Sequence, residues 1–354
     1  MRRIAVTDIK DGNILAKDIF SSSGVVLMSE GTNLKKEYIS RLLELHIEHI
    51  YIRAKEEPEE DFPGAIIEEK VKKQCGELVR DTIQKYTYAE KDELKEMVKV
   101  ADEIISDILN QPEIMYNVSC VRDKNNALYL HSMNVAAIST LIALRSKLSK
   151  KKVKEIAIGA LLHDIGFTAV TVNTSDLVLE QCEESTRKEI MRHVIYGYSD
   201  VETKDWISKT AKDIILQHHE RLDGSGYPFH MKGDHLKTEV GIVALCDQFD
   251  SMVYGNLMPR YKVHDAMDYI MSQAGVKFDF SLVQIFMESV AAYPIGTMVI
   301  TNERDIGIVL RQNYKFPTRP VIRLLKNADG IPYQENEERD LMKVLTLFIV
   351  DSVE

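Results

Sequence analysis

The stretch Leu161-Leu162-His163-Asp164-Ile165-Gly166 decides how the fold of this 354-residue chain is interpreted. The apolar spacing of residues 153–162 predicts a helix, and Gly166 predicts that the helix ends just after the His-Asp pair. The pair therefore closes a helix whose apolar face should be buried. An aspartate in this position can bridge two cations with its two carboxylate oxygens, while the neighbouring imidazole binds one of them.

Ionisable side chains also fall on the apolar faces of four further predicted helices. The set consists of His131, His193, His218 with its neighbour His219, and Asp247. A single histidine on an apolar face is more often a satisfied core residue than a ligand. Several such faces together favour a metal centre, because buried charge is costly unless it is paired or metal-bound, and these stripes carry no lysine or arginine.

The donor types indicate which chemistry such a centre would serve. Imidazole and carboxylate without thiolate suit iron, manganese or zinc in an open catalytic site better than a closed structural zinc site. Two ions about 3.5–4 Å apart can clamp a phosphoryl group and supply the attacking hydroxide. The residues alone therefore predict metal-assisted hydrolysis.

A second motif is the segment from His218 to Pro228, which reads HHERLDGSGYP. Gly224 and Gly226 permit backbone conformations that other residues avoid, and Pro228 stiffens the exit. On its own, Gly-Ser-Gly would indicate only a tight turn. Because it directly follows a His-His pair, we interpret it as part of the site.

These segments together resemble the HD-GYP family, a group of HD phosphohydrolases that hydrolyse the bacterial second messenger cyclic di-GMP. The resemblance extends from about Tyr116 to Ala292. The matching pieces are His131 with Asn134-Val135-Ala136, the Leu161–Gly166 stretch, His193 with Gly197, the His218–Pro228 segment, and Asp247 with Asp250.

The resemblance implies a mainly α fold, with a helical HD domain over 116–292, and a phosphodiesterase that produces pGpG, GMP or both. It also implies a centre of two or three divalent ions, for which we expect iron or manganese. The implied metal ligands are His131, His163, Asp164, His193, His218, His219 and Asp247, with Asp164 bridging. Asp164, His163 and Asp247 are the implied catalytic residues, and Gly226, Tyr227 and Pro228 would shape the substrate rim.

The chain departs from the family pattern in the loop from Thr168 to Glu184, which lacks the family's usual Lys-Pro-Gly turn, and at three further places. Phe167 stands where active members carry a lysine that contacts substrate phosphate. Ala127 stands where members with three metals carry a glutamate, so we expect two ions rather than three. Asn256 lies in a stretch that usually helps to bind phosphate, which leaves Arg260 and Lys262 as displaced candidates for that role.

The flanking segments carry no chemical motif. Residues 1–53 predict a small β-rich unit, whose single helix would be capped by Asn33, and residues 54–64 form an acidic linker. Residues 65–115 predict a helical connector with Val98, Ile105 and Leu109 on its apolar stripe. Such a connector would pack on the next domain or pair with a second chain. Residues 293–354 predict a β-rich extension with a hairpin near 297–310 and strands near 320–325 and 345–350.

Composition limits the partners. With 45 basic and 55 acidic residues the formal net charge is −10, which disfavours binding to a nucleic-acid polymer. No apolar run reaches the ~20 residues that span a bilayer, and the scattered cysteines contain no CxxC pair, so we expect a cytoplasmic protein with reduced thiols. A cyclic dinucleotide is the expected substrate, and a homodimer or a signalling-protein partner stays open.

Two other functions remain open at this point. The departures at Phe167 and Asn256 are also compatible with a weakly active or inactive signalling module that binds a cyclic dinucleotide or a protein. The metal site alone would also serve an HD hydrolase of another nucleotide.

Overall fold

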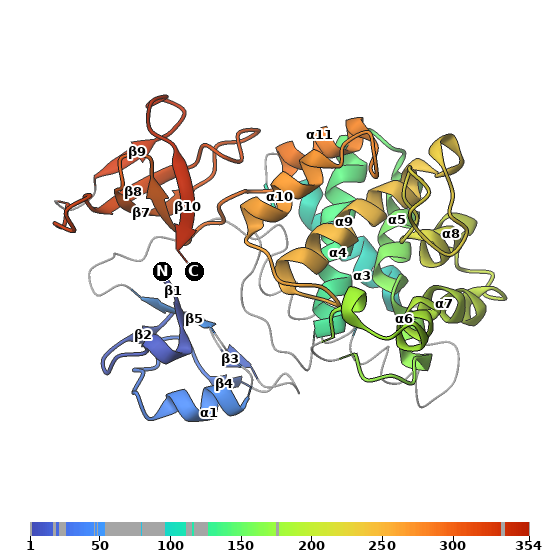
Figure 1. Cartoon of the computed structure of the whole chain (residues 1–354), viewed down its shortest axis with the longest axis horizontal. Helices are drawn as coiled ribbons and strands as arrows, with labels where there is room; N and C mark the ends of the chain where they lie inside the picture. Colours follow the sequence, from blue (N-terminus) through green and yellow to red (C-terminus); the bar gives the residue numbers. More distant parts are fainter. Residues whose placement is uncertain are drawn as a thin grey trace. The chain divides into compact units, whose positions relative to one another are not determined.

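The structure of the chain, a computed structural model, divides into two compact units (Figure 1). One unit contains Met1–Ala65, Met115–Ala127 and Val290–Glu354, and the other contains Ile66–Ile114 and Leu128–Ser289. The residues described are 2–16, 19–20, 26–45, 47, 49–53, 79, 96–110, 115–116, 127–174, 177–333 and 337–353. The predicted linker and most of the predicted connector lie outside these residues.

The N-terminal segment forms small antiparallel sheets, as its alternating apolar residues predict. The strands β1 (Arg2–Ala5), β5 (His49–Arg53) and β2 (Ile14–Leu15) pair in the order β1-β5-β2, and β3 (Ile19–Phe20) pairs with β4 (Val26–Met28). The helix α1 (Tyr38–Glu44) begins after Glu37. The prediction that Asn33 caps this helix is therefore wrong, because Asn33 forms an isolated β-bridge with Ile14 instead.

The C-terminal segment forms an antiparallel sheet in the order β10-β6-β7-β8-β9. Its strands are β6 (Met298–Thr301), β7 (Ile306–Arg311), β8 (Val321–Lys326), β9 (Glu338–Asp340) and β10 (Ile349–Val353). The predicted hairpin corresponds to β6 and β7. The strand predicted near 345–350 begins only at Ile349, and the short charged edge strand β9 was not predicted, because three polar residues carry no apolar alternation.

The helical unit holds the residues singled out above. Its helices are α3 (Glu96–Asn110), α4 (Ala127–Arg145), α5 (Lys150–Leu162), α6 (Glu184–Met191), α7 (His193–Val201), α8 (Lys209–Gln217), α9 (Thr238–Tyr254), α10 (Val263–Ser272) and α11 (Phe280–Ser289). Short 3₁₀ turns η4 (Ile165–Ala169), η5 (Leu179–Gln181) and η6 (Gly233–His235) connect them. In Figure 1, α4, α5 and α9 lie within the body of this unit. None of the described helices is both long and apolar enough to cross a membrane.

Local signals in the sequence set the ends of the central helices. The Ser149 hydroxyl accepts from the Lys152 N–H at 3.3 Å and begins α5, and Ser208 caps α8 in the same way. The helix α9 ends at Gly255, which takes the left-handed conformation with φ +70°. The His-Asp and His-His pairs follow the C-terminal ends of α5 and α8 and lie in turns rather than inside helices.

The connector helix buries a different stripe from the predicted one. In α3, Met97, Val100, Ala101, Ile104 and Ile108 are buried, whereas Leu109 is 50% exposed. The prediction named the wrong face of the helix, because Val98, Ile105 and Leu109 are also apolar and also fall at helical spacing. The helix α3 contacts α5. Among the described residues, α3 therefore packs on the helical unit of the same chain.

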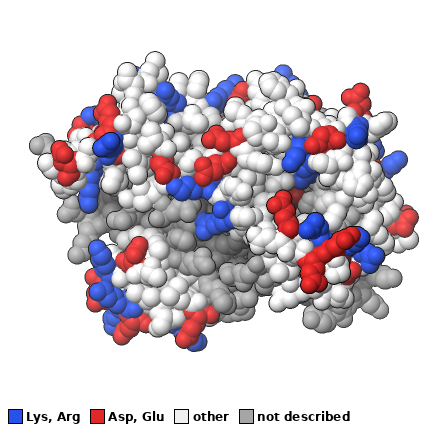
Figure 2. Space-filling view, in the orientation of Figure 1, with Lys and Arg blue, Asp and Glu red and all other residues white. Residues whose placement is uncertain are grey.

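On the face of the molecule shown in Figure 2, basic and acidic side chains are intermingled. This distribution matches the balanced composition of the chain.

Candidate metal centre

Five helices of the helical unit direct donor side chains to one point. His131 lies in α4, His163 is the C-terminal cap of α5 and Asp164 follows it. The remaining donors are His193 at the start of α7, His218 and His219 at the end of α8, and Asp247 in α9. All are buried except the partly exposed His219. The structure therefore brings together every residue that the sequence analysis named as a ligand.

Asp164 lies at the middle of this cluster. Its Oδ2 atom is 3.3 Å from Nε2 of His163 and 3.6 Å from Nε2 of His131. Its Oδ1 atom is 3.4 Å from Nε2 of His193 and 3.6 Å from Nε2 of His218. The two oxygens of one carboxylate thus face two different pairs of imidazoles.

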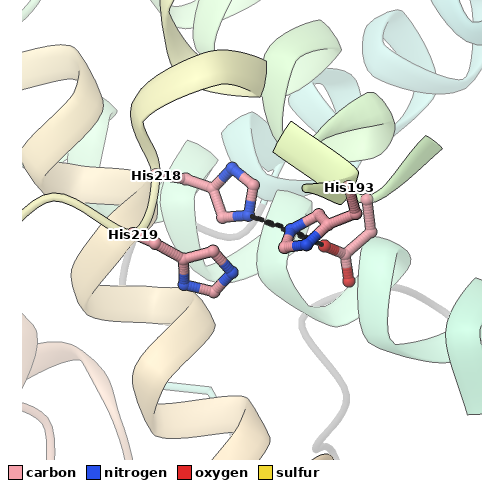
Figure 3. A group of neighbouring side chains, drawn as sticks. His193, His218 and His219 are labelled. Atoms are coloured by element: carbon pink, nitrogen blue, oxygen red, sulfur yellow. Dashed lines mark hydrogen bonds and ion pairs between the residues drawn. The ribbon is translucent and has the colours of Figure 1, made fainter. Parts of the chain in front are cut away.

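The donors accordingly fall into two groups. The first subsite consists of His131, His163, Asp164 and Asp247, and the second subsite consists of Asp164, His193, His218 and His219. In the second subsite, one donor atom from each residue lies within 4.8 Å of the others, and the same holds for His131, His163 and Asp164 in the first. Figure 3 shows the rings of His193, His218 and His219 gathered around one point. Asp247 connects the groups, with Oδ1 3.1 Å from His131 and Oδ2 3.5 Å from His219.

Backbone carbonyls fix which ring nitrogen faces the cluster. Nδ1 of His163 donates to the Ala160 carbonyl at 2.7 Å, and Nδ1 of His193 donates to the Ile190 carbonyl at 2.8 Å. Nδ1 of His218 contacts the carbonyls of Ile214 and Ile215, each at 3.2 Å. A carbonyl can only accept, so each of these Nδ1 atoms carries a hydrogen, and in the neutral ring Nε2 is left as an acceptor that points inward.

Asp250 orients the remaining histidine of the first subsite. Its Oδ2 accepts from Nδ1 of His131 at 2.6 Å, which turns Nε2 of His131 toward Asp247 and Asp164. Asp250 belongs to a motif of the sequence, but no role was predicted for its side chain. Asp250 lies three residues after Asp247, which puts both carboxylates on one face of α9. This spacing is the feature of the sequence that could have indicated a role for Asp250 in the site.

The electrostatics of the cluster favour ionised carboxylates. Burial alone would raise the pKa of Asp164 and of Asp247, but the surrounding histidines lower both pKa values. Burial would likewise lower the pKa of His131, yet its hydrogen bonds to Asp247 and Asp250 raise that pKa to about 10. The first subsite is thus an environment in which positive charge is strongly favoured.

The second subsite gathers acceptor atoms in an arrangement that suits a cation. Burial lowers the pKa of His193 to about 4, so this ring is neutral and its Nε2 is a bare acceptor. That atom lies 3.3 Å from Nε2 of His218 and 3.4 Å from Oδ1 of Asp164. Acceptor atoms that face one another without a proton repel, and a metal ion between them removes this conflict.

A loop after the His-His pair covers one edge of the second subsite. The ring of Tyr227 stacks on His219, with centroids 4.6 Å apart and an interplanar angle of 25°. The buried carboxylate of Glu220 holds this loop, because it accepts from the N–H groups of Phe229 at 2.6 Å and Met231 at 2.9 Å. A Cβ atom at Gly226 would lie 2.3 Å from the His219 carbonyl oxygen, so only glycine allows this approach. Gly226 and Tyr227 therefore lie where the sequence analysis expected them, and Pro228 follows in the same loop.

The other residues singled out lie as follows. Phe167 stacks on His193, with centroids 4.3 Å apart and an interplanar angle of 15°. Arg260 is exposed and follows the end of α9, and Lys262 is the residue before α10. Since α9 continues for seven residues beyond Asp247, its end lies roughly 10 Å along the helix axis from the backbone of Asp247. Ala127 is the first residue of α4, and its side chain lies outside the described part.

Comparisons with known proteins agree with this architecture. A family model described as an HD domain matches residues 114–282, and a model described as a KOW domain associated with HD domains matches residues 298–354. The sequence analysis found no family for the second region. The solved structure of Bd1817, an HDG"Y"P protein from Bdellovibrio bacteriovorus, has the same fold, with 16% identity and a TM-score of 0.50 over 80% of this chain and 97% of that one.

Curated relatives carry names of one enzyme class. A cyclic di-GMP phosphodiesterase of Pseudomonas aeruginosa is 28% identical over 65% of this chain and 55% of its own length. The cyclic di-GMP phosphodiesterase response regulator RpfG of Xanthomonas campestris is 31% identical over 45% of this chain and 42% of its own. The chain thus spans about half the length of these relatives. Residues 114–282 match the HD-domain model, and the resemblance to the HD-GYP family is confirmed by these comparisons.

Proposed function

We propose that this chain is a divalent-metal-dependent phosphodiesterase that hydrolyses cyclic di-GMP to pGpG, GMP or both. The observation that carries the proposal is the division of the Asp164 oxygens between two pairs of inward-facing imidazoles. The names of the curated relatives support the substrate class. The departures from the family pattern bear on how the substrate is held and leave the donor set intact.

The donor set indicates where two ions would bind. His131, His163, Asp164 and Asp247 would hold one ion, and Asp164, His193, His218 and His219 would hold the other. Imidazole and carboxylate donors suit iron or manganese. When bound, such ions supply Lewis-acid charge that polarises a phosphoryl oxygen and acidifies water.

The residues of the chain prepare the site for this chemistry. Asp164 and Asp247 stay ionised, since the histidines around them lower their pKa values, and His163 is held in one tautomer by the Ala160 carbonyl. Burial of these donors keeps bulk water away from them, which strengthens their electrostatic effect on a phosphoryl group. Tyr227 borders the second subsite through its stack on His219, with Gly226 and Pro228 on either side, so this loop would border the substrate. Arg260 and Lys262 are proposed to approach a substrate phosphate from the end of α9.

A signalling module with little or no turnover is the second candidate. It is favoured by Phe167, because an aromatic ring cannot donate to a phosphate, and this ring is already stacked on His193. Such a module would bind cyclic di-GMP, or a protein partner, without cleaving the nucleotide.

Turnover by the metal-loaded chain separates the two candidates. The chain is purified anaerobically, loaded with Mn²⁺ or Fe²⁺ and incubated with cyclic di-GMP, and the products are resolved by ion-exchange chromatography. We expect pGpG or GMP from the unmodified chain and at least about 100-fold slower turnover from Asp164→Asn. The matched control is Asp213→Asn, which changes a carboxylate that pairs with Lys237 at the surface of α8 and should leave turnover unchanged.

Equilibrium binding of cyclic di-GMP is measured on the same samples. Binding without product formation would support the signalling module. Neither binding nor product formation in a folded, metal-loaded chain would overturn both candidates, and a panel of other cyclic dinucleotides would then identify a different substrate.

A further inference from the structure

The two subsites are held in place by different kinds of contact. In the first subsite, both ring nitrogens of His131 have carboxylate partners, with Nδ1 2.6 Å from Asp250 and Nε2 3.1 Å from Asp247. Asp247 itself accepts from the Ser251 hydroxyl at 3.3 Å. Hydrogen bonds between side chains therefore orient His131 and Asp247, while the Ala160 carbonyl orients His163.

In the second subsite, aromatic rings stack on two of the three histidines, His193 and His219. Within the described part of the chain, the single polar contact of the His219 ring is Nδ1 to Asp247 at 3.5 Å, a distance too long for a strong hydrogen bond. The Tyr227 ring instead lies nearly parallel to His219, with centroids 4.6 Å apart. Contact with Tyr227 thus restricts how the half-buried His219 ring can rotate.

Phe167 acts on the other side of the same subsite. Its ring is nearly parallel to that of His193, at 15° and 4.3 Å between centroids. The hydrogen bond from Nδ1 to the Ile190 carbonyl fixes the tautomer of His193 but still allows the ring to tilt about that bond. A face-to-face neighbour limits this tilt and so directs Nε2 at Asp164.

We propose that Phe167 and Tyr227 are positioning residues that set the metal affinity of the second subsite, while the first subsite does not depend on them. The inference rests on the proposed metal centre and is independent of the substrate. It gives Phe167 a defined role, which is to hold a ligand histidine rather than to contact a phosphate. Because His219 lacks a strong hydrogen bond, we assign the second, weaker binding step to the second subsite.

Stepwise titration of the metal-free chain with Mn²⁺ tests this inference without any activity assay. Isothermal calorimetry under anaerobic conditions separates the first and second binding steps. In Phe167→Leu and in Tyr227→Leu, which keep an apolar side chain but remove the ring, we expect the second step to weaken by about tenfold, with the first unchanged. Tyr227→Phe and Phe167→Tyr keep a ring and should bind both ions as the unmodified chain does.

A matched control shows that the ring contacts are responsible. Phe229 lies in the same loop as Tyr227 but is 56% exposed, so Phe229→Leu should leave both steps unchanged. Far-ultraviolet circular dichroism and the thermal midpoint confirm that each variant is folded. A merely structural role for the rings would weaken both steps together, and that result would overturn the proposal.

The remaining outcomes are also decisive. Two unchanged steps in the folded double variant Phe167→Leu/Tyr227→Leu would overturn the stacking role while leaving the two-metal centre intact. Failure of the unmodified chain to bind any Mn²⁺ or Fe²⁺ would instead overturn the metal centre and the stacking role together. Loss confined to the second step, with recovery in the ring-preserving variants, would establish the proposal.

Discussion

Asp250 illustrates how much of this centre depends on single side chains that would touch no metal. It is 1% exposed, and its carboxylate accepts from His131 at 2.6 Å. This bond fixes the tautomer of His131 and increases the basicity of the nitrogen that faces the cluster. The first subsite therefore depends on a residue one helical turn from Asp247.

We predict that Asp250→Ala weakens metal binding at the first subsite by about 10- to 100-fold. It also leaves a buried N–H of His131 without an acceptor, at a cost of about 1–3 kcal/mol in folding stability. Competition with a chelator of known affinity measures the first effect, and urea unfolding measures the second. Asp250→Asn retains an acceptor oxygen and should lose less affinity than Asp250→Ala. Equal, unchanged affinities in both variants would contradict the orienting role.

At the residue scale, the candidate metal ligands could be predicted from the sequence better than the residues that orient them. The ligand candidates could be identified because each falls on an apolar helical stripe where a charged group is out of place. The Asp250–His131 bond joins positions 119 residues apart, and the stack of Phe167 on His193 depends on how η4 meets α7. Spacing along the chain carries no information on such contacts, because they are set by tertiary packing.

At the scale of elements, the approach of η4 to α7 determines where His193 lies. A Cβ atom at Gly166 would be 1.9 Å from the carbonyl oxygen of His193 and 2.4 Å from the nitrogen of Gly197. These are backbone atoms, so no side-chain rotation can relieve the contact. Gly166 is therefore required by the close packing of two backbones, beyond its position at the end of a helix.

We predict that Gly166→Ala destabilises the protein by about 3 kcal/mol, because α7 must move away and take His193 with it. The control is Gly241→Ala in α9, where the nearest atom to a new Cβ is Leu282 Cδ1 at 3.5 Å. That change should stabilise the protein by about 0.5–1 kcal/mol, since alanine favours a helix interior. Urea unfolding of both variants measures these free energies. A Gly166→Ala variant as stable as the unmodified chain would show that the two backbones are not closely packed.

At the scale of the whole molecule, the order of helices and strands followed largely from periodicity. Strongly apolar segments such as 153–162 and 298–310 predicted their elements to within a few residues. The failures have physical causes: α3 offers two apolar stripes, and only packing against α5 selects one of them. The strand β9 has no apolar pattern at all, and its pairing with β8 becomes evident only in the folded sheet.

Metal binding should stabilise the helical unit as a whole, because the donors come from five of its helices and are brought together only by folding. With free Mn²⁺ at about 100 times the dissociation constant, one ion contributes about 2.7 kcal/mol to the unfolding free energy. For a domain of this size the gain corresponds to roughly 5–10 °C in the thermal midpoint. Differential scanning calorimetry with Mn²⁺, and with Ca²⁺ as a control ion that prefers oxygen ligands, measures it. Equal shifts with the two ions would argue against binding by histidines.

The central claim is that Asp164 bridges two metal ions, and the number of ions per chain tests it most directly. The unmodified chain and Asp164→Asn are loaded anaerobically with Mn²⁺, freed of unbound ions and analysed for metal and protein content, with circular dichroism to confirm folding. We predict two ions per chain in the unmodified protein and one or none in Asp164→Asn. Two ions retained by a folded Asp164→Asn variant, or three held by the unmodified chain, would contradict this account.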